Sequence, residues 1–286
     1  MGTSSSAPDS KHYFVPQADK QTFKLVAKDA NDWFELGLHD KVQITHDTYK
    51  FVFKLPEEDQ IIGLPVGGHV FFHFTTAEGE VISRKYTPIS LVNEKGVVTF
   101  IIKLYMPCDE FPKGGAMSQH LHAIAVGAKV KFEGPKGLLS YEGNGNFLLK
   151  SKPLVKKKIG MIAGGSGITP CFQLIQASTL GKDGIPMTLV YTNKTKKDIL
   201  LERELETFAK ENANFKLVHT LTRHSEKDGE WTGLKGRITE EMLKQAGFPG
   251  PSEETLICYC GPAGFNKTVE ELLAKMGYSK DMMHKF

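Results

Sequence analysis

Residues 159–170 read Ile-Gly-Met-Ile-Ala-Gly-Gly-Ser-Gly-Ile-Thr-Pro, and this stretch decides the fold of the second half of the chain. Residues 159–163 form a short apolar run typical of a buried strand. A glycine-bearing turn follows, and a helical pattern then starts at Thr169. Threonine is a good N-cap, and Pro170 at the first helical position loses no needed hydrogen-bond donor. The pattern predicts a strand, a tight turn and a helix whose N-terminus suits a phosphate.

Further strand–helix pairs follow this first one. The predicted strands cover residues 187–191, 215–221 and 255–260, and the predicted helices cover residues 201–210, 239–246 and 264–276. Such alternation predicts a Rossmann-like parallel α/β domain over residues 159–286. Taken alone, the glycine turn is an ambiguous signal for nucleotide binding, because Pro170 stands where G-x-G-x-x-G has its third glycine, and a plain strand–helix turn fits equally well.

The first half of the chain has a different pattern. Short β-branched or aromatic runs occur at residues 51–53, 69–74, 81–82 and 97–104, and turn signals separate them. A short amphipathic stretch starts at Met117. Strands at this spacing predict a small antiparallel barrel or sandwich, which we assign to residues 31–147. We expect residues 1–30 to form a flexible tail and residues 148–158 a linker between the two domains.

The charge balance excludes few functions. The 286 residues include 36 Lys+Arg and 33 Asp+Glu, for a formal net charge of +3, which is unlike a strongly basic nucleic-acid binder. One segment departs from this balance, because residues 150–158 read Lys-Ser-Lys-Pro-Leu-Val-Lys-Lys-Lys. No apolar run approaches the roughly 18 residues that would suggest a membrane span.

The remaining composition favours a cytoplasmic protein. Cys108, Cys171, Cys258 and Cys260 lack zinc or iron–sulfur spacing, and so few cysteines suit a reducing compartment. The first residues, Met-Gly-Thr-Ser-Ser-Ser, fit the N-myristoylation pattern at Gly2, although an unmodified tail fits equally well. We expect a monomer that contacts a membrane only if Gly2 is acylated. We expect no metal, because no carboxylate or cysteine completes a ligand set around the paired histidines.

Residues 84–90 follow a predicted strand and read Arg-Lys-Tyr-Thr-Pro-Ile-Ser. If the strand stays regular up to the proline, alternation places Arg84, Tyr86 and Ser90 on one face and Thr87 on the other. A guanidinium can bind a diphosphate with two hydrogen bonds, and a tyrosine can stack on a flat heterocycle. Each residue alone is ordinary in a strand. Together with the glycine turns, they favour a nucleotide-binding site.

Four motifs in one order give the chain a specific resemblance. They are Arg84-x-Tyr86-Thr87-x-x-Ser90, Gly114-Gly115-x-Met117-Ser118, Gly164-Gly165-Ser166-Gly167-Ile168-Thr169-Pro170 and Cys260-Gly261-Pro262. Three further segments extend the match: Gly63-Leu64-Pro65-Val66-Gly67 with His69, Lys103-x-Tyr105, and Thr195-x-x-Asp198-Ile199-Leu200-Leu201. From about residue 32 to the C-terminus, the chain resembles the NADH–cytochrome b5 reductase family.

The resemblance implies a ferredoxin-reductase-like flavoenzyme whose barrel binds FAD. The residues that it places at FAD are Arg84, Tyr86, Thr87, Ser90, Ile101, Lys103, Tyr105, Gly115, Met117, Ser118 and Thr169. Among them, Arg84 would hold the pyrophosphate, and Ser118 with the amides around Gly115 would hold the diphosphate at a helix N-terminus. Tyr86 and Thr87 would contact the flavin, and Lys103 would lie near the phosphates of the nicotinamide nucleotide.

The resemblance also implies an NADH site in the second domain. The residues that it places there are Gly165, Ser166, Gly167, Thr222, Cys260, Gly261, Pro262 and Phe265. They would orient NADH so that its C4 hydride faces flavin N5, and Thr87, Cys260 and Lys103 would take part in catalysis. The cofactors carry the redox chemistry, while the protein supplies orientation and a site closed to water. Electrons would then pass singly to cytochrome b5.

The chain departs from the family pattern in three places. Ser166 stands where threonine is usual, and Ala263-Gly264-Phe265 replaces Pro-Pro-Met. Thr222 stands where members often carry an acid beside the adenosine ribose. A carboxylate there accepts a hydrogen bond from the 2′-hydroxyl and repels a 2′-phosphate. We therefore predict weaker discrimination against NADPH than is usual for the family.

Two other functions remain alternatives. One is the reductase module of a nitrate reductase, although such a module normally follows haem and molybdenum domains for which this chain has no room. The other is a flavin and NADH electron-transfer subunit serving a different acceptor. A basic rim raises association rates with an acidic partner. We expect Lys113, Lys150 and Lys152 to help dock cytochrome b5. For Lys150 and Lys152, a solvated linker between the domains explains the cluster of lysines equally well.

Overall fold

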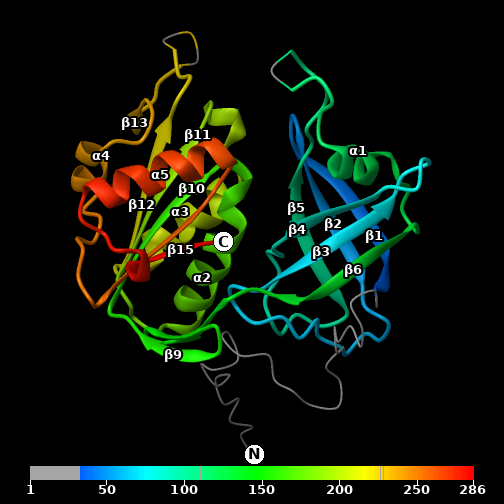
Figure 1. Cartoon of the computed structure of the whole chain (residues 1–286), viewed down its shortest axis with the longest axis horizontal. Coiled ribbons are helices and arrows are strands. Elements are labelled where there is room, and N and C mark those ends of the chain that lie inside the picture. The colour runs from blue at the N-terminus through cyan, green and yellow to red at the C-terminus, as the bar shows by residue number, and fades with distance from the viewer. Residues whose placement is uncertain (1–32, 110, 226, 228) are drawn as a thin grey trace, which may run out of the picture.

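A computed structural model describes residues 33–109, 111–225, 227 and 229–286. The first half is a six-stranded antiparallel sheet in the order β4-β3-β6-β1-β2-β5. Its strands are β1 (Phe34–Thr45), β2 (Thr48–Lys54), β3 (His69–Thr75), β4 (Val81–Tyr86), β5 (Val97–Lys103) and β6 (Lys129–Lys136), and helix α1 is Ala116–Ala123. The Ile89 N–H donates to Thr99 O at 2.8 Å, which joins the segment after β4 to the opposite edge strand. The sheet thus closes into the predicted barrel (Figure 1).

Aromatic residues at alternate positions fill the barrel. The ring centroids of Phe72 and Phe132 are 4.3 Å apart, and the Phe53 ring meets Phe132 edge-on at 5.0 Å. These residues and Phe100 have no exposed surface. Period-2 alternation on neighbouring strands therefore produces a single dry interior.

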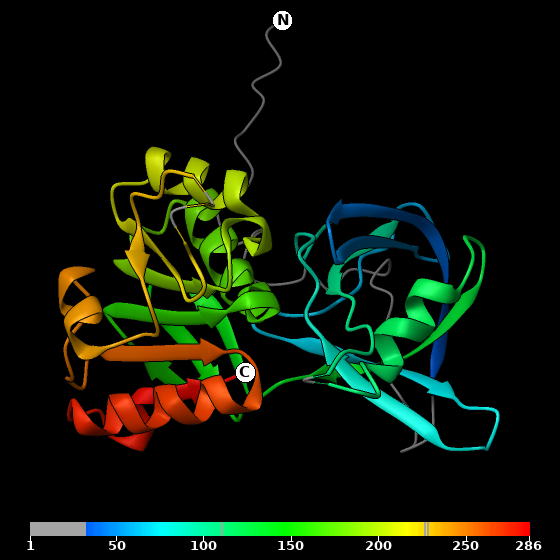
Figure 2. The same cartoon turned by 90° about the horizontal axis from the view of Figure 1, so that it is seen from above.

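The second half is a six-stranded parallel sheet in the order β13-β12-β11-β10-β14-β15. Its strands are β10 (Lys158–Gly164), β11 (Met187–Asn193), β12 (Phe215–Leu221), β13 (Leu234–Lys235), β14 (Thr255–Cys260) and β15 (Met283–Lys285). Its helices are α2 (Ile168–Gly181), α3 (Glu202–Glu211), α4 (Glu240–Gln245) and α5 (Ala263–Lys275). α2 and α3 cover one face and α5 the other (Figure 2). The predicted Rossmann-like arrangement is confirmed.

The start of α2 differs from the expectation. The helix begins at Ile168, after a 3₁₀ turn over Gly165–Gly167, and Gly167 is its N-cap. Thr169 is therefore inside the helix, where its hydroxyl donates to Ser166 O at 3.4 Å. The extra turn shifts the helix start by about one residue. Pro170 still costs no hydrogen bond, because the first four amides of a helix have no partner within it.

Residues 139–155 form a third, three-stranded antiparallel sheet. Its strands are β7 (Leu139–Gly143), β8 (Asn146–Leu149) and β9 (Lys152–Val155). The apolar side of this sheet carries Leu139, Tyr141 and Phe147, which belong to the same core as α2. The Tyr141 hydroxyl also donates to Asp183, just after α2. Residues 148–158, expected as a linker, are thus largely strand.

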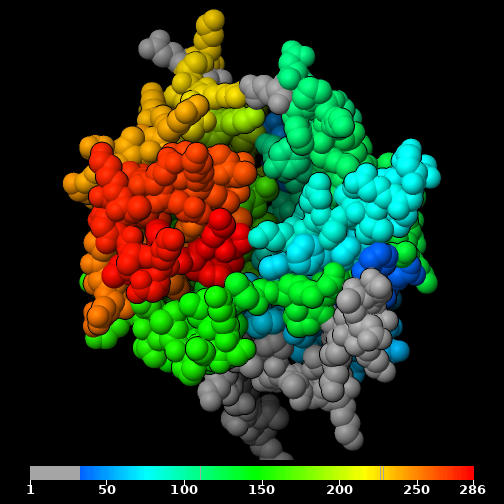
Figure 3. Space-filling view, viewed as in Figure 1, coloured from blue at the N-terminus to red at the C-terminus, as the bar shows by residue number. Residues whose placement is uncertain are grey.

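The two halves lie side by side, with α2 between them (Figure 2). Val66, Val92 and Ile101 of the first half share a core with α2. In the space-filling view a furrow runs between the halves (Figure 3). Among the described residues, no helix is long and apolar enough to cross a membrane. Gly2 and the predicted tail lie outside the described residues.

Candidate functional site

One wall of the furrow is the N-terminus of α1. Gly114 has φ +60°, and a Cβ there would lie 2.5 Å from Tyr105 O. The Gly115 N–H donates to the same Tyr105 oxygen at 2.7 Å. The N-cap Gly115 offers no side chain, so the first-turn amides of α1 are left for an anion. The buried Met117 side chain anchors this turn in the barrel core.

The Ser118 hydroxyl holds the loop before α1. It donates to Gly115 O at 3.0 Å and accepts from the Tyr105 N–H at 3.1 Å. The hydroxyl proton expected to bind the diphosphate directly is therefore committed to the loop. Ser118 therefore fixes the turn that precedes α1.

Residues 84–90 leave the strand earlier than the alternation assumed. β4 ends at Tyr86, so the assignment of Ser90 to the face of Arg84 does not hold beyond that residue. Arg84 is exposed, and Nη1 donates to Ser83 O at 2.7 Å. Tyr86 packs its ring 4.7 Å from Phe72, and burial raises the pKa of its hydroxyl. Buried Ser90 accepts from the Thr99 N–H at 3.1 Å.

The opposite wall is built from the two glycine turns of the second half. They follow β10 and β14, which are hydrogen-bonded neighbours, so both turns lie at the carboxyl edge of the sheet. A Cβ on Gly167 would lie 2.3 Å from Cys260 O, so only glycine permits this contact. The Phe265 ring lies against Gly261 and Gly164, where added Cβ atoms would be 2.4 and 3.1 Å from ring carbons. Phe265 therefore fills the angle between the turns.

Cys260 faces the furrow as a neutral thiol. It is half-buried, and burial raises its pKa to about 11, although nearby Lys85 acts in the opposite direction. A thiol that stays protonated at neutral pH is a weak nucleophile. Cys260 can therefore line a pocket as a polarisable surface, but it is not suited to covalent chemistry. Pro262, the N-cap of α5, is exposed beside it.

Thr222 ends β12 at the same edge of the sheet. Its N–H and its hydroxyl both donate to Asn193 O, at 2.9 and 3.3 Å. The Arg223 N–H donates to Lys194 O at 2.8 Å. These bonds join the ends of β11 and β12 and place two basic residues, rather than a carboxylate, at this point.

Several side-chain contacts bridge the furrow among the described residues. The Tyr105 and Ser166 hydroxyls are 3.3 Å apart, and Lys103 Nζ is 3.0 Å from Asp198 Oδ1. Gln173 on α2 accepts from the Gly67 N–H at 2.9 Å and is buried. Gln173 was not among the predicted site residues, and no local pattern distinguishes it from Gln176 on the same helix.

Lys103 forms a second ion pair on its own side of the furrow. Its Nζ is 2.7 Å from Asp47 Oδ2, and the Lys103 side chain is 19% exposed. Burial alone would lower the pKa of Lys103, but the two carboxylates outweigh it and hold the pKa above its usual value. The ammonium expected near nucleotide phosphates is thus committed to Asp47 and Asp198.

A candidate metal group coincides with this ion pair. His46, Asp47 and Asp198 offer ligand atoms within 4.8 Å of one another. Lys103 already supplies positive charge to both carboxylates. Sequence analysis paired other histidines and missed this group, because Asp198 is far from the other two residues along the chain.

Comparisons with known proteins match both halves of the chain. The oxidoreductase FAD-binding domain matches residues 35–141, and the oxidoreductase NAD-binding domain matches residues 161–271. NADH-cytochrome b5 reductase 2 from Xenopus tropicalis is 40% identical over 92% of this chain and 88% of its own length. Nitrate reductase [NADH] from Solanum lycopersicum is 41% identical over 84% of this chain, but over 27% of its own length. The crystal structure of the cytochrome b5 reductase domain of Ulva prolifera nitrate reductase has a TM-score of 0.83 and 33% identity, covering 90% of this chain and 98% of that one.

Proposed function

The chain belongs to the NADH-cytochrome b5 reductase family, and from this we propose a flavoprotein reductase that passes electrons from NADH through FAD to cytochrome b5. The observation that carries the proposal is the furrow itself. An anion-binding helix terminus faces two touching glycine turns, and both halves match cofactor-binding domains. We place the FAD domain at residues 31–147 and the NADH domain at residues 159–286, with the β8–β9 segment joining them.

The barrel residues fit FAD. In the proposal, Arg84 and the first-turn amides of α1 bind the diphosphate, while Tyr86 and Thr87 contact the flavin ring. Ile101, which is buried beneath the furrow, gives the ring an apolar floor. When held by these residues, FAD would supply the chemistry that links two-electron hydride transfer from NADH to single-electron transfer to the acceptor.

The α/β residues fit NADH. The close approach of Gly167 to Cys260 brings the two turns together, and Gly165, where an added Cβ would meet nothing within 4 Å, offers open backbone on which a nucleotide can lie. Cys260 as a neutral thiol then borders the nicotinamide, and Thr169 reaches the flavin from the second half. Tyr191 supports this surface, since its hydroxyl donates to Gly165 O at 3.1 Å. The protein thus orients the nucleotide and excludes water.

The test is optical. The purified protein should be yellow, and anaerobic NADH should bleach the flavin within seconds, with NADPH compared at the same concentration. Absence of bleaching by both nucleotides would contradict the proposal. Reduction of cytochrome b5 should then follow in the presence of NADH. A protein that bleaches but reduces only artificial acceptors would favour the alternative of a reductase module serving another acceptor.

For acceptor docking we propose the exposed lysines at 113, 150 and 152. Lys113 precedes α1, whereas the other two belong to the turn and start of β9, and these elements lie at opposite ends of the view in Figure 1. They therefore form two separate positive regions, which separate variants can distinguish. K150E/K152E and K113E should raise KM for cytochrome b5 and leave ferricyanide reduction unchanged. An equal effect on both acceptors would refute docking.

The cellular setting is also a proposal. We place the protein in the cytoplasm as a monomer, attached to membranes through Gly2 when that residue is acylated. Radiolabelled myristate should then enter the protein expressed with an N-myristoyltransferase, and should not enter G2A.

A further inference from the structure

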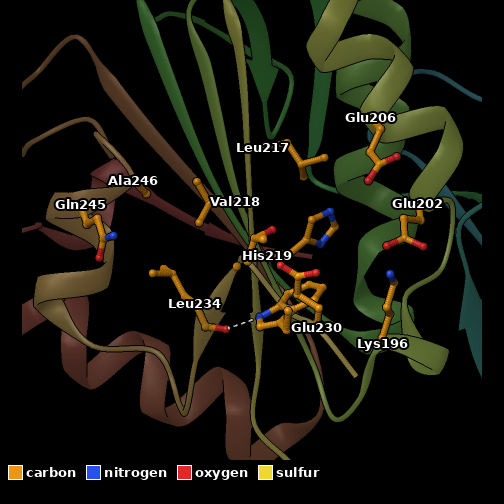
Figure 4. Close-up of a pocket in the computed structure, with 13 residues that line it drawn as sticks. Lys196, Glu202, Glu206, Leu217, Val218, His219, Glu230, Leu234, Gln245 and Ala246 are labelled. Atoms are coloured by element: carbon orange, nitrogen blue, oxygen red, sulfur yellow. Dashed lines mark hydrogen bonds between the residues drawn. The ribbon is translucent and has the colours of Figure 1, made fainter. Parts of the chain in front are cut away.

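A cavity of about 700 Å³ lies at the outer edge of the parallel sheet. It is bounded by β12, the side of α3, the end of α4 and residues 230–234 (Figure 4). None of the residues assigned above to FAD or NADH lines it. The cavity is therefore separate from the furrow between the two halves.

The topology explains why the edge is hollow. β13 pairs with β12 only at Thr220 and Leu221, so within the described part of the chain no strand pairs with the outer side of the preceding β12 residues. The segment before β13 covers part of this edge with Trp231. The Trp231 Nε1–H donates to Leu234 O at 2.9 Å, and the ring lies against Gly233, where a Cβ would be 2.5 Å from a ring carbon. The indole is thus held in place at the cavity wall.

The polar group at the back of the cavity is His219. Both ring nitrogens are buried, and neither has a hydrogen-bond partner among the described residues. Burial lowers the pKa of His219 to about 4, so the ring is neutral near pH 7, with one donor and one acceptor nitrogen. Its ring is directed toward α3 (Figure 4). A buried imidazole with both nitrogens unused incurs a desolvation cost that a ligand would relieve.

The rim of the cavity is acidic. Glu202 and Glu206 are one helical turn apart on α3 and both line the cavity, as does Glu230 (Figure 4). Burial and then repulsion from Glu206 raise the pKa of Glu202, and Lys196 opposes this only in part. A cation between the two α3 carboxylates would remove their repulsion.

We propose that this cavity binds an organic cation with a planar amidinium or guanidinium head and an apolar body. The head would donate to the Glu202 and Glu206 carboxylates, and to the acceptor nitrogen of His219 after a rotation of the buried ring. The body would stack on the Trp231 indole, where a cation and a flat surface are both favoured. A planar donor group suits this site better than an ammonium, because a guanidinium-type head is more weakly hydrated and stacks on aromatic faces.

The chain provides its own reporter for a binding experiment. It contains two tryptophans, so W33F leaves Trp231 as the single indole. W33F protein is titrated with benzamidine, and with benzamide as a neutral molecule of the same shape. We expect benzamidine to quench Trp231 fluorescence with saturation and benzamide to bind at least tenfold more weakly. Equal binding of the two, or no saturable change up to tens of millimolar, would overturn the proposal.

Charge variants locate the binding. E202Q/E206Q in the W33F protein should weaken benzamidine binding by tenfold or more, whereas E271Q, an exposed glutamate on α5, should leave it unchanged. Unaltered affinity in E202Q/E206Q would refute the site. If that variant does not fold, the benzamidine-to-benzamide ratio on W33F alone decides. The readout requires neither NADH nor an acceptor, so its failure is distinct from failure of the reductase assignment.

Discussion

Replacing Lys103 with methionine tests whether its ammonium serves the fold or the nucleotide. The side chain keeps its length but loses the charge, which leaves Asp47 and Asp198 without their shared cation. Removing one partner of a fully buried pair costs about 3–5 kcal/mol, and removing an exposed one costs about 0–1 kcal/mol. The Asp198 side chain is 10% exposed and that of Asp47 is 24% exposed. We therefore expect K103M to lower the free energy of unfolding by about 2 kcal/mol.

The assay is a double-mutant cycle on the holoprotein, with urea unfolding and KM for NADH measured for K103M, D198N and the double variant. A pair that bridges the furrow predicts a coupling energy of about 1.5 kcal/mol and a raised KM in both single variants. K129M is the control, because Lys129 is 71% exposed and pairs with Glu35 only at 3.8 Å. Its effect on unfolding should stay below about 0.5 kcal/mol.

Two results would refute this reasoning. A coupling energy near zero would mean that Lys103 and Asp198 do not depend on each other. A lower KM in D198N, together with a higher KM in K103M, would mean that Asp198 competes with the nucleotide for the ammonium. In that case Lys103 would bind phosphates directly, as the family resemblance implied.

Three further variants probe the site. T222D should raise the ratio of kcat/KM for NADH to that for NADPH about tenfold, because a carboxylate accepts a hydrogen bond from the 2′-hydroxyl and repels a 2′-phosphate. A wild-type ratio that is already very large, and that T222D leaves unchanged, would contradict this prediction. G167A should lower the free energy of unfolding by about 2 kcal/mol and raise KM for NADH, because the new Cβ would lie 2.3 Å from the Cys260 carbonyl oxygen. G264A is the control, because a Cβ at Gly264 would meet nothing within 4 Å. Burial would raise the pKa of Asp198, but hydrogen bonds from Thr195 and Lys103 hold that pKa below its usual value. The ionised carboxylate therefore stabilises the fold fully above about pH 5, and this stabilisation is lost on acidification, so the wild type should lose more stability than D198N between about pH 5 and 3. Parallel pH profiles of the two proteins would contradict this prediction.

The order of elements could be predicted because it depends on local patterns. Apolar runs such as residues 159–163 and 255–260 became neighbouring parallel strands, and the glycine turns after them met at the sheet edge. The glycine-rich turn indicated that glycine is needed at position 167. The reason for that need, the contact of Gly167 with Cys260, could not be predicted because it joins two segments that are distant in the chain.

The cross-furrow contacts could not be predicted for the same reason. Lys103 and Asp198 each belong to a motif, but nothing local indicates that they pair. The alternation assigned to Arg84 through Ser90 failed after Tyr86, because a strand period holds only while the ladder continues. The Thr169 capping role failed because the N-cap lies two residues earlier, at Gly167, after a 3₁₀ turn that the pattern did not indicate.

The packing of the β7–β9 sheet bears on how the halves of such proteins can be recombined. Leu139, Tyr141 and Phe147 are covered by the α2 side of the second half, although they precede the lysine-rich segment. A chimaera joined at residue 148 would separate these side chains from the surface that covers them. A junction near Gly137, between β6 and β7, keeps Leu139, Tyr141 and Phe147 with the α2 side that covers them. Exchange of barrels between homologues should therefore succeed at Gly137 and yield aggregating protein at residue 148.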